Sequence, residues 1–242
     1  MTTAAPLIVG PADRVFILTG AGISAESGIR TFRDSNGLWE EHRMEDVASP
    51  GGWAKDRALV WRFYSDRRKQ ALSVDPNPAH KALAELEAQI GDRLTLCTQN
   101  VDPLHEAGGS KRVIHMHGEL ARSRCDRDHQ KPFWDEQLYY GFDAIPRCQC
   151  GGWIRPHICW FGEVPFHMAS IQEALMKCTV LVTIGSSGAV YPAAGFVKIA
   201  NQIGARTVYV GLERPDNAEL FSEIRLGRAG KLVPRLFQID TQ

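Results

Sequence analysis

Apolar runs of strand length recur along the chain, and most of them are continuously apolar rather than alternating with polar residues. Continuous runs of this length indicate strands that are buried on both faces of a parallel sheet. Small or polar residues end each run. The predicted strands are Val15–Thr19, Leu94–Thr98, Val113–Met116, Val180–Ile184, Thr207–Val210 and, with a weaker pattern, Lys231–Val233.

Helical patterns lie between these runs. Pro78–Ile90 carries Ala82, Leu83, Leu86 and Ile90 on one face, and Gly91 follows as a typical helix end. Met168–Cys178 and Ala193–Gly204 have similar patterns. Strands that alternate with helices predict an α/β fold with a doubly wound parallel sheet.

Two stretches depart from this alternation. Residues 34–73 read as a loop followed by a helix over Arg57–Leu72. Residues 119–157 show little periodicity and hold three of the six cysteines. Both stretches read as insertions, and we expect them to form a small second domain together.

Composition narrows the class of protein. The 242 residues hold 28 Lys+Arg and 28 Asp+Glu, so the formal net charge is zero. A general nucleic-acid or membrane-surface binder needs a basic excess, so neither partner is expected. Six cysteines are too few for a disulfide scaffold, no apolar run is long enough to span a bilayer, and the first residues lack a basic signal-peptide region. We therefore expect a cytoplasmic protein with reduced thiols.

The first predicted strand runs into Gly20-Ala21-Gly22-Ile23-Ser24-Ala25, a G-x-G-x-x-A pattern. Glycines at these positions let the backbone approach a phosphate, and a helix that follows offers free N–H groups. A tight strand-to-helix turn without a ligand is the alternative. No acidic residue ends a strand about 20 residues later, which disfavours an ordinary hydride-transfer enzyme.

Polar side chains also follow the next strands. Gln99, Asn100 and Asp102 come directly after the second strand and could bind a ribose and a carboxamide, or could instead cap the next helix. His115 and His117 end the third strand, where a histidine can act as a general base or have only a structural role.

Five motifs occur in a fixed order and together resemble the sirtuin family of NAD-dependent protein deacylases. They are GAGISAESGIRTFR (20–33), TQNVD (98–102), HMHGEL (115–120), RPHICWFGE (155–163) and GSSGAVYPAAGF (185–196). The likeness is to bacterial CobB-like members of class III, which includes the mitochondrial desuccinylase. It implies a Rossmann-like NAD-binding domain made of residues 1–33, 74–118 and 158–242. Residues 34–73 and 119–157 would form the small domain, with a helical module and a zinc-type module.

The resemblance also implies site residues. His117 would be the catalytic base, with Asn100 and Asp102 beside it. The residues implied for NAD binding are Gly20, Ala21, Gly22, Thr31, Phe32, Arg33, Gln99, Asn100, Asp102, Gly185, Ser186, Ser187 and Ala229. One departure stands at Gly211, where the family usually carries an asparagine that contacts the adenosine ribose.

The implied reaction removes acyl groups from lysine side chains of proteins and yields nicotinamide and O-acyl-ADP-ribose. Tyr64 and Arg67 are three residues apart on the predicted helix, so they share a face and could bind a carboxylate. In the class resembled, such a pair recognises succinyl- or malonyl-lysine, and a small residue at Ala48 leaves room for the acyl chain. Without the resemblance, a solvated basic face at Arg67 and Arg68 would be the ordinary interpretation.

Alternatives remain for the activity: a deacetylase without preference for acidic acyl groups, or a mono-ADP-ribosyltransferase. For a deacylase, the resemblance implies that the protein partner is bound by backbone pairing near 162–163 and 187–190.

The cysteines of the second insertion suggest a structural zinc. Cys125, Cys148 and Cys150 supply three ligands and His129 a fourth, with Asp128 as a weaker candidate. The usual two C-x-x-C pairs are incomplete, so a module that folds without metal is the alternative. Cys97, Cys159 and Cys178 stand in apolar contexts and are expected to be core thiols.

Overall fold

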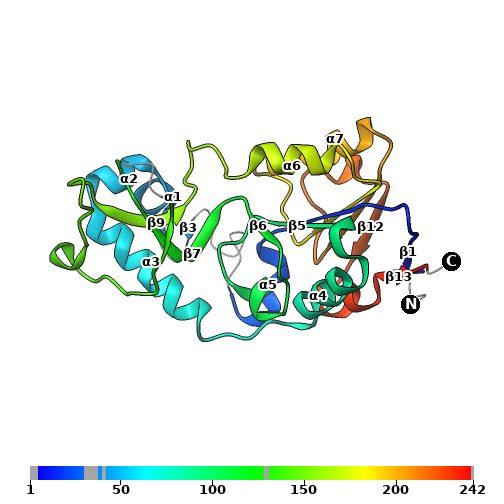
Figure 1. Cartoon of the computed structure of the whole chain (residues 1–242), viewed down its shortest axis with the longest axis horizontal. Helices are drawn as coiled ribbons and strands as arrows, with labels where there is room; N and C mark the ends of the chain where they lie inside the picture. Colours follow the sequence, from blue (N-terminus) through cyan, green and yellow to red (C-terminus); the bar gives the residue numbers. More distant parts are fainter. Residues whose placement is uncertain (1–4, 30–37, 40–41, 128–130, 241–242) are drawn as a thin grey trace.

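The structure is a computed structural model of the chain, and it describes residues 5–29, 38–39, 42–127 and 131–240 (Figure 1). Its largest element is a six-stranded parallel sheet with the order β12-β11-β10-β2-β5-β6. The chain leaves β2 toward β5 and β6 on one side, and later continues through β10, β11 and β12 on the other. This is the strand order of a Rossmann fold, and the direction reverses between β2 and β10. The strands are β2 (Val15–Thr19), β5 (Leu94–Thr98), β6 (Val113–His115), β10 (Val180–Ile184), β11 (Arg206–Gly211) and β12 (Glu223–Leu226).

Helices cover both faces of this sheet, which explains why its central strands are buried throughout and largely apolar. Every residue of β2 and β10 is buried. Ile17 of β2 belongs to the cluster that includes α4 (Pro78–Ile90), whereas its neighbour Phe16 belongs to the cluster that includes α6 (Met168–Leu175) and α7 (Phe196–Gln202). Figure 1 shows α4 on one side of the sheet and α6 and α7 on the other. Successive side chains of a strand point to opposite faces, so a strand covered on both sides has no polar face.

The sequence pattern predicted the bounds of β2, β5, β10 and α4 as the structure has them. The weaker strand prediction at Lys231–Val233 was wrong, because this segment forms α8 (Ala229–Leu232) and the start of a 3₁₀ turn. Three residues are too few to separate a helical period from a strand period. The pattern also missed a parallel pair formed by β1 (Leu7–Val9) and β13 (Phe237–Ile239), whose partners lie at opposite ends of the chain.

A second, antiparallel sheet has the order β8-β7-β9 and packs against the helices from residues 44–71. Its apolar cluster includes Trp61, Tyr64 and Trp160 and is separate from the clusters of the large sheet. Figure 1 shows this group at one end of the molecule. The grouping supports the predicted division into two domains, which stays a prediction. The elements are α1 (Met44–Val47), α2 (Pro50–Lys55), α3 (Arg57–Ala71), β7 (Gly118–Cys125), β8 (Phe133–Trp134) and β9 (Ile154–Ile158).

Three short elements complete the α-helices and strands of the described chain: β3 (Leu38–Trp39), which pairs with β4 (His42–Arg43), and α5 (Leu104–Ala107) after β5.

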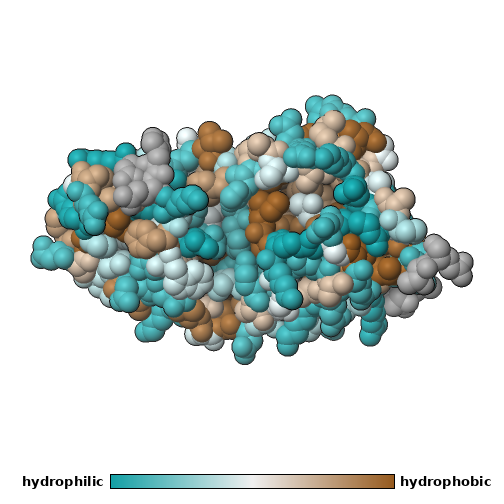
Figure 2. All heavy atoms as spheres, in the orientation of Figure 1, coloured by the Kyte–Doolittle hydropathy of each residue, from teal (hydrophilic) through white to brown (hydrophobic). Residues whose placement is uncertain are grey.

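Hydrophilic residues cover much of the face drawn in Figure 2, and apolar residues form small groups among them. Within the described ranges, no helix combines the length and the apolar character that crossing a membrane requires.

Candidate active site

A cavity of about 420 Å³ lies at the carboxyl ends of β2, β5, β10 and β11 and extends to α3. In a parallel sheet this edge is the usual ligand site, especially where the strand order reverses. Thr31, Phe32 and Arg33 lie outside the described residues. All other residues predicted to bind cofactor or acyl group, and His117, line the cavity: Gly20, Ala21, Gly22, Ala48, Tyr64, Arg67, Gln99, Asn100, Asp102, His117, Gly185, Ser186, Ser187 and Ala229.

The glycines after β2 allow two strand ends to pack against each other. A Cβ atom at Gly20 would lie 2.8 Å from the Ser186 Cα, and one at Gly22 would lie 2.8 Å from the Gly185 Cα. The Gly22 N–H also donates to the Gly185 carbonyl oxygen at 2.9 Å. Short 3₁₀ turns at 21–23 and 25–27 follow, rather than the regular helix that the sequence suggested. These glycines therefore have a packing role in addition to the predicted phosphate role.

Asn100 and Asp102 are held in place by Ser24, a buried residue that the sequence analysis did not single out. The Asn100 side-chain amide donates to the Ser24 Oγ at 3.1 Å, and the Ser24 hydroxyl donates to the Asp102 carboxylate at 3.1 Å. The other Asp102 oxygen accepts the N–H of Leu104, the first residue of α5. Asp102 thus binds the first backbone N–H of α5 and also lines the cavity, and its predicted role toward a ribose stays a prediction.

Burial raises the pKa of Asp102, whereas its hydrogen bonds to Leu104 and Ser24 lower it. The carboxyl group thus lies in a site where both of its oxygens already accept hydrogen bonds. Such a group is well ordered before any ligand binds, which suits a role in positioning.

His115 at the end of β6 and His117, two residues later, have different surroundings. His117 lines the cavity, and its Nδ1 lies 3.0 Å from the Gln99 carbonyl oxygen. A carbonyl only accepts, so Nδ1 carries the proton and Nε2 of the neutral ring keeps a lone pair. Burial lowers the pKa of His117, against the opposing effect of the Gln99 bond. The ring is therefore neutral at physiological pH and able to accept a proton.

His115 is structural by its contacts. Its Nε2 lies 2.7 Å from Glu106, and its Nδ1 lies 3.3 Å from the Asn100 carbonyl oxygen. Burial is the largest single influence and lowers the pKa of His115, but the hydrogen bond and charge of Glu106, with smaller contributions from Glu119 and the Asn100 carbonyl, together raise it above its ordinary value. Of the two histidines, only His117 is among the cavity's lining residues.

Gly211 leaves space that Tyr209 fills. A Cβ atom at position 211 would lie within 2.9 Å of three atoms of the Tyr209 ring and hydroxyl. The Tyr209 hydroxyl donates to the Ser186 carbonyl oxygen at 3.0 Å, and the Gln99 amide donates to the Ser186 Oγ at 3.0 Å. Tyr209 and Gly211 both line the cavity. Residues two apart on a strand share a face, so the glycine is what allows the tyrosine to reach Ser186.

At the far end of the cavity, α3 contributes Tyr64 and Arg67, both buried. Arg67 is 7% exposed and donates to the Gln70 side chain at 3.2 Å. The interpretation of Arg67 and Arg68 as a solvated basic face is therefore wrong, because Arg68 is only 2% exposed. One of these two arginines faces the cavity and the other faces the protein interior.

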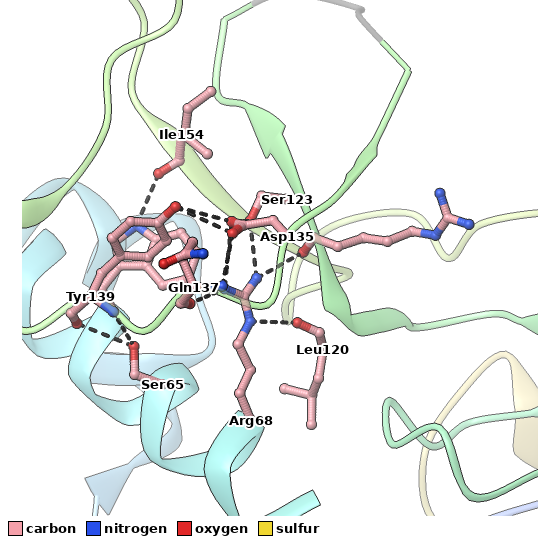
Figure 3. Close-up of polar contacts among 10 residues, drawn as sticks. Ser65, Arg68, Leu120, Ser123, Asp135, Gln137, Tyr139 and Ile154 are labelled. Carbon is pink, nitrogen blue, oxygen red and sulfur yellow. Dashed lines mark hydrogen bonds and ion pairs between the residues drawn. The ribbon is translucent and has the colours of Figure 1, made fainter. Parts of the chain in front are cut away.

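Arg68 binds two segments that lie against α3 in the folded chain (Figure 3). Its guanidinium donates to the carbonyl oxygens of Leu120 and Gln137, each at 2.6 Å, and lies 3.4 Å from Asp135. Asp135 also accepts from Ser123 and from Gln137 N–H. This network ties α3 to β7 and to the chain after β8, and thereby fixes the helix that carries Tyr64 and Arg67.

The Sir2 family profile matches residues 20–192 of this chain. A protein of Shewanella oneidensis named NAD-dependent protein deacylase is 52% identical, over 95% of this chain and 94% of its own length. The chain belongs to the Sir2 family. The structure resembles a crystal structure of a Sir2 homologue in complex with NAD, with a TM-score of 0.84 and 36% identity over 93% of this chain and 89% of that one.

A second solved sirtuin is a mutant in complex with a p53 peptide and NAD. It has a TM-score of 0.77 and is 29% identical over 92% of this chain and 91% of that one. The family assignment and the Rossmann-type parallel sheet that the sequence predicted are thereby confirmed.

Three sulfur atoms of this sirtuin form a possible metal site apart from the cavity. The Sγ atoms of Cys125, Cys148 and Cys150 lie within 4.8 Å of one another. Tetrahedral zinc with Zn–S bonds of about 2.3 Å brings its sulfur ligands about 3.8 Å apart, which lies within this limit. His129 and Asp128 lie outside the described residues. The three thiols therefore fit three of the four ligand positions of a tetrahedral zinc ion.

Sequence reasoning missed several residues of this cavity. Gln70 and Tyr209 line it and stand outside the five ordered motifs. Trp160 and Glu163 also line it; both belong to the motif at 155–163, but the sequence analysis gave Trp160 no role and named Glu163 only within the 162–163 peptide segment. Cys159 was expected in the core, but it is half-buried and lines the cavity, whereas Cys97 and Cys178 are buried as expected. A usable signal existed for Gln70, because it follows Arg67 by three residues on the same helix.

Proposed function

We propose that this NAD-dependent protein deacylase removes succinyl and malonyl groups, as well as acetyl groups, from lysine side chains of proteins. One observation carries the proposal: the buried guanidinium of Arg67 lines the same cavity as His117. A cation held out of water gains most from an anion that enters the same space. An acyl group with a terminal carboxylate supplies that anion, and an acetyl group does not.

The neighbours of Arg67 support this assignment. Tyr64 offers a phenol on the same face of α3, and Ala48 adds only a methyl group to the cavity wall. Burial raises the pKa of Tyr64, so the phenol stays protonated and can donate to a carboxylate at neutral pH. Arginine together with a hydroxyl donor is a strong carboxylate receptor.

For NAD we propose the residues at the strand ends. Gly20, Ala21 and Gly22 would lie against the phosphates, with Gly185, Ser186, Ser187 and Ala229 toward the adenosine half. Bound NAD supplies the sugar carbon that accepts the acyl oxygen when nicotinamide leaves, and O-acyl-ADP-ribose is the expected product. Gln99, Asn100 and Asp102 would orient the ribose and nicotinamide. His117 would take a proton on Nε2, the nitrogen left with a lone pair by the Nδ1 bond to Gln99.

The protein substrate would enter beside the 162–163 and 187–190 segments, of which Gly162, Glu163, Ser187 and Val190 line the cavity. Backbone pairing there would bind the peptide with little side-chain selectivity. The cytoplasmic location and the lack of nucleic-acid partners stay predictions.

The test is nicotinamide release from NAD with acetyl-lysine and succinyl-lysine peptides of the same sequence. We expect turnover of both, and we expect Arg67→Met to abolish turnover of the succinyl peptide while largely sparing the acetyl peptide. Arg62→Met is the matched control, because Arg62 is exposed on the same helix.

Three results would point elsewhere. No turnover of the succinyl peptide by the native protein would leave a deacetylase without acidic-acyl preference. Equal loss of both activities in Arg67→Met would contradict the receptor role. Transfer of label from NAD to protein without any acyl-lysine would favour a mono-ADP-ribosyltransferase.

We further propose that Cys125, Cys148 and Cys150 hold a structural zinc, with His129 as the fourth ligand. The sulfur geometry supports three of these four ligands. Metal analysis of the purified protein should find about one zinc per chain. A content near zero in a folded, active protein would refute the site.

A further inference from the structure

Trp160 and Tyr64 meet in the wall of the cavity, although they are 96 positions apart in the chain. The indole Nε1–H of Trp160 donates to the Tyr64 hydroxyl oxygen at 3.0 Å. Both side chains are almost wholly buried, at 1% and 0% exposure. A phenol hydroxyl can accept one hydrogen bond and donate another, so the bond from Trp160 bears on how the phenol is oriented toward a ligand.

Other residues hold the indole of Trp160 in one orientation. The Arg155 guanidinium carbon lies 3.3 Å from the centroid of the Trp160 ring, over its face. Arg155 in turn binds both oxygens of Glu163, at 2.7 and 3.0 Å. One of these oxygens also accepts the backbone N–H of Trp160 at 2.9 Å. Glu163 thus holds the backbone of Trp160, and Arg155, which pairs with Glu163, lies against the indole face. In this orientation the indole N–H points at Tyr64.

We propose that Trp160 is a positioning residue that selects acidic acyl groups by orienting the Tyr64 hydroxyl to donate to the acyl carboxylate. This inference rests on the proposed function, because it needs a carboxylate beside Arg67. In a dry site, a hydroxyl that accepts a hydrogen bond becomes a stronger donor, since the two bonds polarise each other. An acetyl group has no carboxylate to receive the bond and gains nothing from Trp160.

The same contacts connect the acyl end of the cavity to the peptide end. Glu163 follows Trp160 by three residues and lines the cavity where we expect the substrate backbone. Trp160 thus connects the segment where we expect the peptide, at 162–163, with Tyr64, where we expect the acyl carboxylate. The contact between Trp160 and Tyr64 is direct, through the indole N–H at 3.0 Å.

The first experiment replaces Trp160 by phenylalanine, which keeps an aromatic ring and removes the N–H. We expect kcat/KM for the succinyl peptide to fall about fivefold to tenfold, the usual effect of one hydrogen bond. The loss should appear in KM for that peptide, and acetyl-peptide turnover should change less than about twofold. Trp134→Phe is the matched control, because Trp134 is 60% exposed and does not line the cavity.

The second experiment asks whether Trp160 acts through Tyr64. In a Tyr64→Phe background the phenol oxygen is gone, so Trp160→Phe should have no further effect on succinyl-peptide KM. An undiminished effect in that background would overturn the proposal. An equal fall in succinyl and acetyl turnover after Trp160→Phe alone would also overturn it, because packing alone would then explain the result.

Trp160 is part of an apolar cluster, and Trp160→Phe could lower stability. Incorporation of 3-benzothienylalanine at position 160 replaces the N–H by sulfur with almost no change of shape, and it should give the same selective loss. Arg67→Met separates this proposal from the proposed function. If Arg67→Met abolishes desuccinylation while both variants at position 160 leave it unchanged, only the role of Trp160 is refuted. If the native protein does not turn over the succinyl peptide, the proposed function itself is wrong.

Discussion

Arg68→Met should destabilise the protein far more than the same change at its neighbour Arg67. The Arg68 guanidinium donates to three carbonyl oxygens and to Ser123, and it pairs with Asp135 at 3.4 Å (Figure 3). The side chains of Arg68 and Asp135 are 2% and 4% exposed. Methionine fills similar space but leaves a buried carboxylate without its cation.

The size of the effect follows from these contacts. Removing one partner of a buried ion pair lowers the free energy of unfolding by about 3–5 kcal/mol. Asp135 keeps hydrogen bonds from Ser123, Tyr139 and Gln137, which favours the lower end of that range. For a chain of this length each kcal/mol shifts Tm by roughly 2–4 °C, so Tm should fall by at least about 6 °C.

Thermal unfolding followed by circular dichroism, with urea unfolding as a second measure, tests this expectation. Arg62→Met is the surface control and should change the free energy of unfolding by less than about 1 kcal/mol, and Arg67→Met is the buried control and should lose less stability than Arg68→Met. Arg68→Met combined with Asp135→Asn should recover part of the loss, since the uncompensated charge is removed. A Tm for Arg68→Met that matches either control would refute the assigned role of the network.

Two further predictions concern the nucleotide end and the pH dependence of stability. Tyr209→Phe removes the hydroxyl that binds the Ser186 carbonyl oxygen, so KM for NAD should rise several-fold while KM for the peptide stays unchanged. Tyr140→Phe is the control. A KM for NAD equal to that of the native protein would contradict the prediction. Burial lowers the pKa of His80 and of His157 to about 4, below the ~6.5 of an unfolded chain. Their neutral forms therefore stabilise the fold above pH ~6.5, and this contribution is lost as the pH falls toward 4. Urea unfolding at steps between pH 7 and 4 should show the free energy of unfolding falling, and a flat profile would count against this.

Local patterns in the sequence determined most of the large sheet. The strands around residues 15–19 and 180–184 are buried at every position and largely apolar, because helices cover both faces of the sheet. The polar residues of the site follow these strands directly, so parallel strand ends bring them to one edge. That is why the ordered motifs were enough to predict the cavity and the Sir2 family.

Strands that pair across long stretches of sequence could not be predicted from local patterns. β1 pairs with β13 across 230 positions of sequence, since Leu7 lies opposite Phe237. β7 and β9 are joined by pairs such as Gly118 with Ile158, with an irregular register between Gly118 and Ser123. Neither pattern repeats over enough residues to give a periodic signal.

The family resemblance singled out Arg67 and His117, but only the tertiary structure shows what holds their neighbours of the same residue type away from the cavity. Arg67 and Arg68 are the same residue type, but Arg68 meets carbonyl oxygens and a carboxylate from residues 120–137, more than 50 positions away. His115 meets Glu106 while His117 remains at the cavity. A sequence shows the kind of group available at each position through local spacing. Which partner neutralises or binds that group depends on segments that become neighbours only when the chain has folded.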